Sequence, residues 1–386
     1  MYIKGSFLGL ILFLNGLFSL AQAQAQAQDK DKVLSIDTFI PYVSTVPANK
    51  DQIVGLHLRE RVLESTQKNT AKGTKPEVVL FVHGGFSPST VAYDLNHKDF
   101  SWMANLAKDG FDTFALTMTA YGSSPRPYMD DPCNVDPKQQ SILIPHILKA
   151  PCAPHYPYKL VSSQTEWDEV EAAVRYIRKI RGVDKINLVG WSTGTPRIGG
   201  FAAQHPEMVK RIVFLAPAPF FENDKPPVTF PEPGSPVLLQ TRERLEGERW
   251  MADVKCSDQI DDADIRDVMW RELMLVEGAG ANWIPGGVMR APNRMNYGWR
   301  ENVPKIKAPT LILLGEFDNF EARHDAWKAL TVEKKAFLKV ACGSHYLQYE
   351  RQRPVVFKAT KEWFKYGTIN GKDSGYYSAD SKGVIQ

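Results

Sequence analysis

The sequence has 386 residues, enough for one large α/β domain with insertions or for two or three average domains. Its composition is 43% apolar, 24% charged and 11% aromatic, which excludes a disordered, collagenous or polytopic membrane protein. Lys and Arg number 47 against 44 Asp and Glu, so the net charge is only +3, and neither sign forms long runs. Such a balance argues against a nucleic acid or an anionic membrane as a partner.

The first residues predict export from the cytoplasm. Lys4 precedes an apolar stretch over residues 7–20, and the small residues at 21–25 offer several Ala-x-Ala cleavage sites. We therefore expect a signal peptide over residues 1–23, a mature domain over residues 24–386, and a secreted or periplasmic location. The apolar stretch is shorter than the about 20 residues that a spanning helix needs, so we expect no stable membrane anchor after cleavage.

Short apolar runs alternate with helical patterns along the chain. The expected strands are residues 78–82, 114–116, 186–189, 212–215, 311–314 and 337–341. The expected helices are residues 101–109, 163–180, 196–205, 326–330 and 355–364. Apolar strands separated by helices indicate an α/β fold with a mostly parallel sheet that helices cover on both faces. Residues 36–43 and 52–63 should add antiparallel edge strands.

The clearest helix has predictable ends. Ser163 and Glu166 have the spacing of a capping box at its start, and Gly182 ends it. Between them, apolar residues recur at helical spacing from Val170 to Ile180, which indicates one buried face.

Two segments do not follow the alternation. Residues 126–162 belong to a region with eight prolines between Pro125 and Pro157, which excludes a long helix or a central strand. Residues 217–304 lie between two sheet strands and are too long for a loop, so we expect an inserted cap or lid. Its many Trp and Met side chains either pack a small core of the insert or line a substrate cavity, and the sequence leaves both roles open.

The cysteines suit an oxidising compartment. They are Cys133, Cys152, Cys256 and Cys342. The first two flank the proline-rich segment, and we expect them to form a local disulfide. The last two are far apart in the sequence, which argues against a bond between them. A zinc site of the first two with His146 and His155 is the alternative, since Cys and His at this spacing can bind zinc, but a disulfide-closed surface loop suits the same residues better.

One motif carries the chemistry. Gly190-Trp191-Ser192-Thr193-Gly194 is the only G-x-S-x-G in the chain, and it follows the strand over 186–189 directly. A helix that admits Pro196 in its first turn comes next, so the motif has the strand-turn-helix setting of a nucleophile elbow. The flanking glycines allow a sharp turn, which should force Ser192 into a strained backbone conformation and lift its hydroxyl above the sheet.

A serine hydroxyl becomes a good nucleophile only when a base takes its proton and a carboxylate orients that base. Asp318 follows the strand over 311–314, and His345 follows the strand over 337–341. The order Ser192, Asp318, His345 is that of the α/β hydrolases. Over about residues 75–365 the sequence resembles this superfamily, in its esterase and lipase branch. Glu316 is the alternative candidate for the acid.

The resemblance also implies an oxyanion hole of main-chain N–H groups. One donor would be Thr193, after the nucleophile, and the other Gly85 or Phe86, in the loop after His83. No cofactor and no metal are implied. A serine at the elbow argues against the branches with an aspartate nucleophile, and the absence of a proline in the His83 loop argues against the prolyl iminopeptidases.

We therefore expect a serine hydrolase that cleaves a carboxylic ester of a small, largely apolar substrate through an acyl-enzyme on Ser192. The same triad could cleave an amide, a lactone or a carbon-carbon bond. A ligand-binding protein on a hydrolase scaffold is the alternative from another class. The sequence does not predict the oligomeric state.

Overall fold

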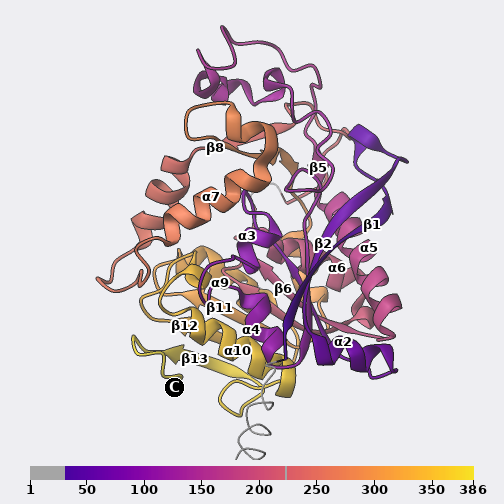
Figure 1. The fold of residues 1–386 in the computed structure, drawn as a ribbon, viewed down its shortest axis with the longest axis vertical. Helices are drawn as coiled ribbons and strands as arrows, with labels where there is room; N and C mark the ends of the chain where they lie inside the picture. The colour runs from indigo at the N-terminus through magenta and orange to yellow at the C-terminus, as the bar shows by residue number, and fades with distance from the viewer. Residues whose placement is uncertain (1–30, 222–223) are drawn as a thin grey trace, which may run out of the picture. The chain divides into compact units, whose positions relative to one another are not determined.

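A mostly parallel sheet forms the centre of the fold, which confirms the predicted fold class. The computed structural model describes residues 31–221 and 224–386, and within them nine strands pair in the order β1-β2-β4-β3-β6-β7-β11-β12-β13 (Figure 1). They are β1 (Val33–Val43), β2 (Ile53–Leu63), β3 (Glu77–Val82), β4 (Phe111–Leu116), β6 (Ile186–Trp191), β7 (Val209–Leu215), β11 (Thr310–Gly315), β12 (Lys335–Val340) and β13 (Gly375–Ala379). Val33–Gln386 form one compact unit. The predicted signal peptide, residues 1–23, lies outside the described residues.

The strand directions place several loops together. Strands β1, β2 and β4 are antiparallel neighbours, and all neighbours from β4 to β13 are parallel. The antiparallel direction predicted for residues 36–43 and 52–63 is confirmed, but β2 lies inside the sheet, because β4 covers its second side. Since β3, β6, β11 and β12 run in one direction, the loops after them meet at one edge of the sheet.

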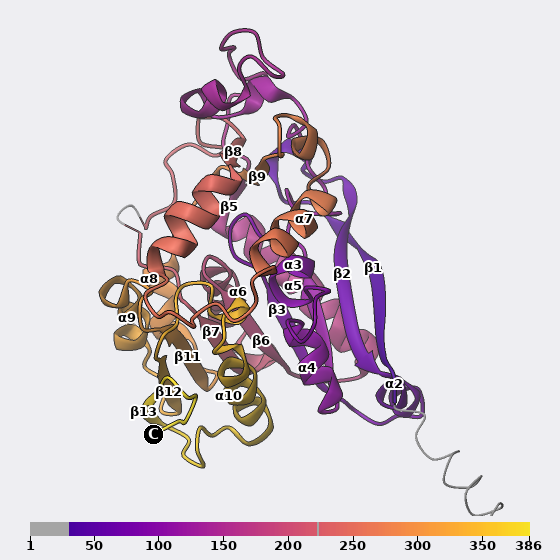
Figure 2. The same ribbon diagram turned by 60° about the vertical axis from the view of Figure 1, so that its left-hand side comes forward.

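Helices cover the sheet on both faces (Figures 1 and 2). They are α2 (Glu64–Ala71), α3 (Ser89–Tyr93), α4 (Trp102–Lys108), α5 (Ser163–Arg181), α6 (Gly194–Gln204), α7 (Ile265–Glu277), α8 (Trp299–Asn302), α9 (Phe320–Ala329) and α10 (Arg353–Tyr366). Helix α4 packs on α10, where the rings of Trp102 and Phe357 stack at 5.5 Å, and α5 packs on α6. In the described part of the chain, no helix has the length and apolar character needed to cross a membrane.

Helix α5 shows how the predicted boundaries shift. Its capping box is formed by Ser162 and Thr165, one residue before the predicted pair: the Ser162 hydroxyl accepts the Thr165 N–H at 3.2 Å, and the Thr165 hydroxyl accepts the Ser162 N–H at 2.9 Å. Glu166 instead binds buried arginines. Gly182 ends the helix with φ 62°, as predicted. The buried stripe runs from Val170 to Ile177, and Ile180 is exposed.

The two inserted segments bind each other. The first, residues 126–162, holds short 3₁₀ turns and the two-residue strand β5 (Val161–Ser162), and the second, residues 217–304, holds β8 (Val237–Gln240), β9 (Met289–Pro292) and β10 (Arg294–Met295). Strand β5 pairs with β10, and β8 pairs with β9. The Gln139 amide accepts the Leu239 N–H at 2.8 Å and donates to the Leu239 carbonyl at 2.9 Å. We call these two segments together the joined inserts.

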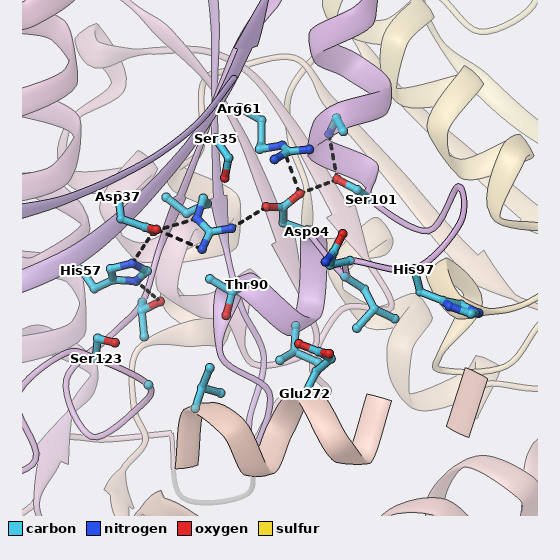
Figure 3. A pocket seen from close by; sticks show the side chains of 18 of the residues that line it. Ser35, Asp37, His57, Arg61, Thr90, Asp94, His97, Ser101, Ser123 and Glu272 are labelled. Atoms are coloured by element: carbon cyan, nitrogen blue, oxygen red, sulfur yellow. Dashed lines mark hydrogen bonds and ion pairs between the residues drawn. The ribbon is translucent and has the colours of Figure 1, made fainter. Parts of the chain in front are cut away.

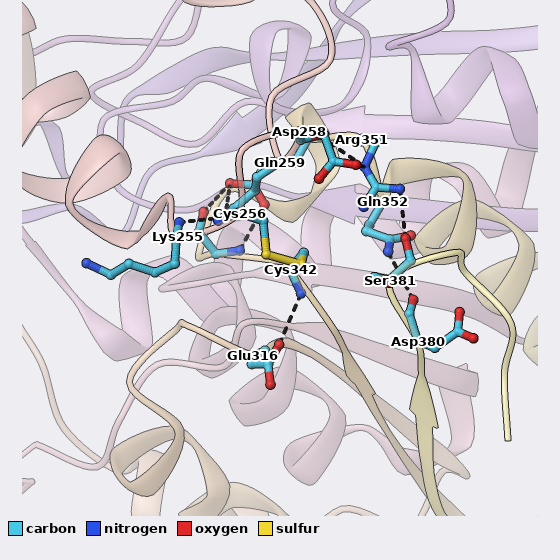
Figure 4. The surroundings of a disulfide bond; sticks show 12 residues. Lys255, Cys256, Asp258, Gln259, Glu316, Cys342, Arg351, Gln352, Asp380 and Ser381 are labelled. Atoms are coloured by element: carbon cyan, nitrogen blue, oxygen red, sulfur yellow. Dashed lines mark hydrogen bonds and ion pairs between the residues drawn. A yellow bond between two sulfur atoms is a disulfide. The ribbon is translucent and has the colours of Figure 1, made fainter.

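Two disulfides join the four cysteines. The Cys133–Cys152 bond confirms the predicted local pair, and it also removes both thiolates from the alternative zinc site. The expectation that Cys256 and Cys342 stay unpaired is wrong, because they form the second disulfide (Figure 4). The fold brings the second insert against the loop after β12, so the 86 residues between them in the sequence do not separate them in space.

Candidate active site

Ser192 lies in the sharp turn between β6 and α6, at the edge of the sheet. Its φ is +54°, in the left-handed region that a serine rarely adopts. Both motif glycines are required here. A Cβ at Gly190 would lie 2.7 Å from the Gly194 carbonyl oxygen, and one at Gly194 would lie 2.2 Å from that of Val82. The turn is fixed by the Ser192 N–H, which donates to the Leu215 carbonyl on β7 at 3.0 Å.

His345 and Asp318 form a hydrogen-bonded pair on neighbouring loops. The distance from His345 Nδ1 to Asp318 Oδ2 is 2.9 Å, and Asp318 is buried. Glu316, the alternative acid, instead accepts the Cys342 N–H at 3.2 Å. The structure thus brings together the Asp and His that the strand order predicts, and it places Glu316 elsewhere.

The charges in this pair suit a neutral histidine. Burial lowers the pKa of His345, and the negative charge of Asp318 offsets that effect only in part. Burial acts to raise the pKa of Asp318, but interactions with His345 and with Arg323 outweigh it, so the pKa lies below its usual value. Asp318 is therefore ionised at neutral pH, and His345 is an uncharged imidazole that can accept a proton.

Trp191 connects the serine turn to the histidine loop. Its Nε1 donates to the His345 carbonyl at 2.9 Å, and its ring lies 5.6 Å from the His345 imidazole. No hydrogen bond within 3.5 Å joins the Ser192 hydroxyl to His345 among residues 31–221 and 224–386. Such bonds between catalytic groups often shorten only when substrate is present.

The loop after β3 packs against the serine turn. A Cβ at Gly84 would lie 3.1 Å from the Cβ of Ser192, and one at Gly85 would lie 3.7 Å from the Thr193 hydroxyl oxygen. Phe86 has φ +58°, so the loop turns sharply here. Gly84 and Gly85 therefore pack against Ser192 and Thr193, and Phe86 follows them in the same loop.

A buried arginine on α6 binds the main-chain carbonyls of this loop. Arg197 on α6 is 0% exposed, and its Nη1 donates to the carbonyls of His83 at 2.6 Å and Gly84 at 3.2 Å. Its Nε and Nη2 bind Glu166 at 2.9 and 2.8 Å, and Glu166 also pairs with Arg294 of the joined inserts. In a trans peptide the Gly84 carbonyl and the following N–H point in opposite directions. Binding of this carbonyl therefore turns the Gly85 N–H away from the buried guanidinium.

His83 acts on the same carbonyl and is not a second base. Its Nδ1 lies 2.7 Å from the Gly84 oxygen, and its Nε2 accepts the Met118 N–H at 3.1 Å, which fixes the neutral tautomer with the proton on Nδ1. Burial, and next the charge of Arg197, hold the pKa of His83 well below its usual value.

Comparisons with known proteins agree with this fold. The model of the family described as "alpha/beta hydrolase fold" matches residues 77–236, which include the loop after β3 and the serine turn. This chain has the α/β-hydrolase fold, and its residues 77–236 match that family. A search of the curated proteins found no match.

Solved structures of similar fold superpose on most of this chain. A thermophilic esterase from Thermogutta terrifontis superposes with a TM-score of 0.50 at 14% identity, over 85% of this chain and 98% of that one. Naproxen esterase from Bacillus subtilis superposes with a TM-score of 0.46 at 15% identity, over 94% of this chain and 100% of that one. A serine hydrolase involved in carbazole degradation superposes with a TM-score of 0.48 at 15% identity, over 85% of this chain and 97% of that one. At such identities the likeness concerns the fold alone.

The site also contains a cation that the sequence did not predict. Arg323 on α9 forms an ion pair with the second oxygen of Asp318, and its Nη1 donates to the Pro217 carbonyl at 2.8 Å. It therefore connects the candidate acid to the start of the second insert. An arginine five residues after the acid has no motif around it, so no signal in the sequence could have singled it out.

Glu350 connects the histidine loop to the second insert. Its carboxylate is fully buried and accepts the Ser344 N–H at 2.8 Å and the Ser344 hydroxyl at 2.5 Å. From the insert it accepts Trp250 Nε1 and Gln259 Nε2, both at 3.0 Å. The ring of Trp250 also stacks on Tyr346 at 5.1 Å. The residues on both sides of His345 are thus held by the insert.

The tryptophans of the second insert mainly pack its core. All four are at most 5% exposed: Trp250, Trp270, Trp283 and Trp299. Of the two roles that the sequence leaves open, their burial supports packing rather than the lining of an open cavity.

A cavity of about 740 Å³ lies apart from the candidate catalytic residues, between the β1–β2 edge and α7 (Figure 3). Its charged groups largely satisfy one another. Asp37 binds His57 at 2.8 Å and Arg59 at 2.7 Å, and Arg59 also reaches Asp94 at 2.9 Å. None of the three candidate catalytic residues lines this cavity, so we do not assign the reaction to it.

Proposed function

We propose that this α/β hydrolase is a serine hydrolase that cleaves a carboxylic ester through an acyl-enzyme on Ser192. The observation that carries the proposal is the Asp318–His345 hydrogen bond on loops beside the strained Ser192 turn. We also propose that the protein is secreted or periplasmic. The two disulfides support this location, because disulfides persist in oxidising compartments.

Each residue has a defined role in the first half of the reaction. Asp318 accepts a hydrogen bond from the Nδ1–H of His345, which keeps the proton on Nδ1 and leaves the Nε2 lone pair free for the serine hydroxyl. Nε2 takes that proton as Ser192 Oγ attacks the ester carbon, and the carbonyl oxygen becomes an oxyanion. The N–H groups of Thr193 and of Gly85 or Phe86 would stabilise its charge.

The second half returns the enzyme to its starting state. The protonated His345 gives its proton to the departing alkoxide, so the alcohol leaves and the acyl group stays on Ser192. Water then enters, loses a proton to His345 Nε2 and attacks the acyl carbon. When the tetrahedral intermediate collapses, the carboxylic acid is released and the histidine returns the proton to Ser192.

Replacing Ser192 by alanine tests the proposal. Because the triad acts as a unit, kcat for a 4-nitrophenyl ester should fall by about a thousandfold or more. Labelling by a fluorophosphonate probe should disappear as well. Ser123→Ala is the matched control, since Ser123 is an exposed serine remote from the triad, and it should keep both activities. Full ester turnover by the Ser192→Ala protein would exclude the proposed function.

A further inference from the structure

A second, smaller cavity adjoins the oxyanion loop. It has a volume of about 310 Å³, and Phe86 forms part of its wall. The rest of the wall comes from the joined inserts and includes β8 and the short π-helix Arg244–Trp250, which carries Arg249. A substrate whose carbonyl oxygen sits between Phe86 and Thr193 can therefore extend into this space.

The polar groups in this cavity include a donor without an acceptor. Gln240 is only 2% exposed, and its Nε2 has no hydrogen-bond partner in the part of the chain that the structure describes. The other end of the same amide, Oε1, accepts Arg249 Nη1 at 3.5 Å. A buried amide donor without an acceptor is costly, so Gln240 Nε2 gains by binding an acceptor oxygen that enters the cavity.

The guanidinium beside it also lacks a carboxylate. The two acids nearest to Arg249 in the sequence pair with other arginines: Glu248 with Arg244 at 3.6 Å, and Glu246 with Arg242 at 2.7 Å. Within residues 31–221 and 224–386, Arg249 forms no ion pair within 4.0 Å. Burial is the main cause that lowers the pKa of His345, and the positive charge of Arg249 adds to it.

We propose that this cavity binds a carboxylate of the substrate through the Gln240 amide and the Arg249 guanidinium, so that the hydrolysed ester is anionic. The planar guanidinium fork fits the two oxygens of a carboxylate, and the Gln240 amide adds a donor to one of them. That the bound molecule is an ester rests on the proposed function. That this cavity binds a carboxylate does not.

The remaining wall of the cavity agrees with a short aliphatic chain that ends in a charge. Leu238 and Leu239 supply apolar surface. Lys138 and Arg244 add positive charge, and the single acid, Asp136, uses its carboxylate to accept the Lys138 N–H at 2.9 Å. A half-ester of a short dicarboxylic acid matches this arrangement. The largely apolar substrate expected from the sequence does not use these donors.

The test compares two esters of similar length, 4-nitrophenyl hydrogen glutarate and 4-nitrophenyl pentanoate. The natural protein should have the higher kcat/KM for the glutarate ester. In Arg249→Gln the ratio of the two kcat/KM values should fall by about 10- to 100-fold, the worth of one charge-assisted hydrogen bond. The ratio is the proper readout, because loss of Arg249 also changes the pKa of His345, and that change affects both esters alike. Gln240→Leu should lower the ratio in the same direction.

Arg271→Gln is the matched control. Arg271 is an exposed arginine of α7 whose nearest carboxylate is Glu272 at 3.6 Å, and it does not line the cavity, so the ratio should stay unchanged. An equal ratio in the natural protein and in Arg249→Gln would overturn the proposal. Tighter inhibition by phosphate than by glutarate would overturn the assignment of a carboxylate.

A binding measurement separates this proposal from the esterase function. Calorimetry of glutarate with Ser192→Ala should show binding that the Ser192→Ala/Arg249→Gln protein loses. If no ester is hydrolysed and no fluorophosphonate adduct forms, but this difference in binding persists, the proposed function fails and the anion site stands. Equal binding by both proteins refutes the anion site.

Discussion

Replacing Cys256 and Cys342 together by serine tests whether the disulfide holds the candidate base in position. Cys342 lies three residues before His345, and Cys256 belongs to the second insert (Figure 4). Without the bond, the histidine loop is still held by Glu350, but it gains freedom at its start. Catalytic geometry is sensitive to displacements of about 1 Å, so kcat/KM should fall by about tenfold.

The size of the stability effect follows from the lengths of the closed rings. The Cys256–Cys342 bond has a sequence separation of 86 residues, which corresponds to about 4.6 kcal/mol in the chain-entropy model. The separation for Cys133–Cys152 is 19 residues, which corresponds to about 3.2 kcal/mol. The difference, about 1.3 kcal/mol, is the amount by which the first double variant should be less stable than the second.

Equilibrium unfolding in urea, followed by tryptophan fluorescence, measures the free energies of both double variants at one temperature. The Cys133→Ser/Cys152→Ser protein is the matched control, because its disulfide lies in the first insert and should be less important for kcat/KM. If the two variants lose equal stability, the ring-length argument is refuted. If the Cys256→Ser/Cys342→Ser protein keeps full kcat/KM, the disulfide does not position His345.

Two further predictions concern buried charges. In Arg197→Met the Gly84 carbonyl loses its guanidinium donor, so kcat should fall by about 10- to 1000-fold with a smaller change in KM; an unchanged kcat would contradict the role of Arg197 in orienting the oxyanion loop. Burial raises the pKa of Glu169 from 4.5 to about 7, so the folded protein binds this proton more tightly than the unfolded chain, and stability falls as the pH rises from 4.5 to 7. In Glu169→Gln this fall in the free energy of unfolding should be smaller by up to about 3 kcal/mol, as measured by urea unfolding at pH 4.5 and at pH 7. If the free energy of unfolding changes equally with pH in both proteins, the raised pKa of Glu169 is refuted.

Local patterns predicted the centre of the fold well. The strands β6 and β11 are buried along their whole length, and β3 and β7 are buried except at Glu77, Lys210 and Arg211, so their apolar runs are visible in the sequence. The serine turn was predictable because two glycines and a serine satisfy a backbone requirement that few other residues meet. Strand β13 escaped prediction, because it is a short edge strand with exposed tyrosine and glycine and no apolar run.

Contacts between distant segments account for what the sequence missed. Arg323 and Arg197 gain their roles only when α9 and α6 pack beside the loops after β11 and β3, and neither residue stands in a local pattern. The disulfide between Cys256 and Cys342 depends on where the second insert folds back. The capping box was misplaced by one residue for a different reason: Ser162 and Ser163 are both good N-caps, and only the backbone conformation decides between them.

The hydrogen bonds between the joined inserts limit how this enzyme can be altered by recombination. Residues 126–162 and 217–304 are separated by the serine turn, yet strand β5 pairs with β10, and Gln139 binds both main-chain groups of Leu239. A chimera that receives only one of the two segments from a relative would leave the main-chain groups of the other unpaired. A change of substrate range by exchange of these regions therefore requires that both segments be transferred together, with the serine turn between them kept intact.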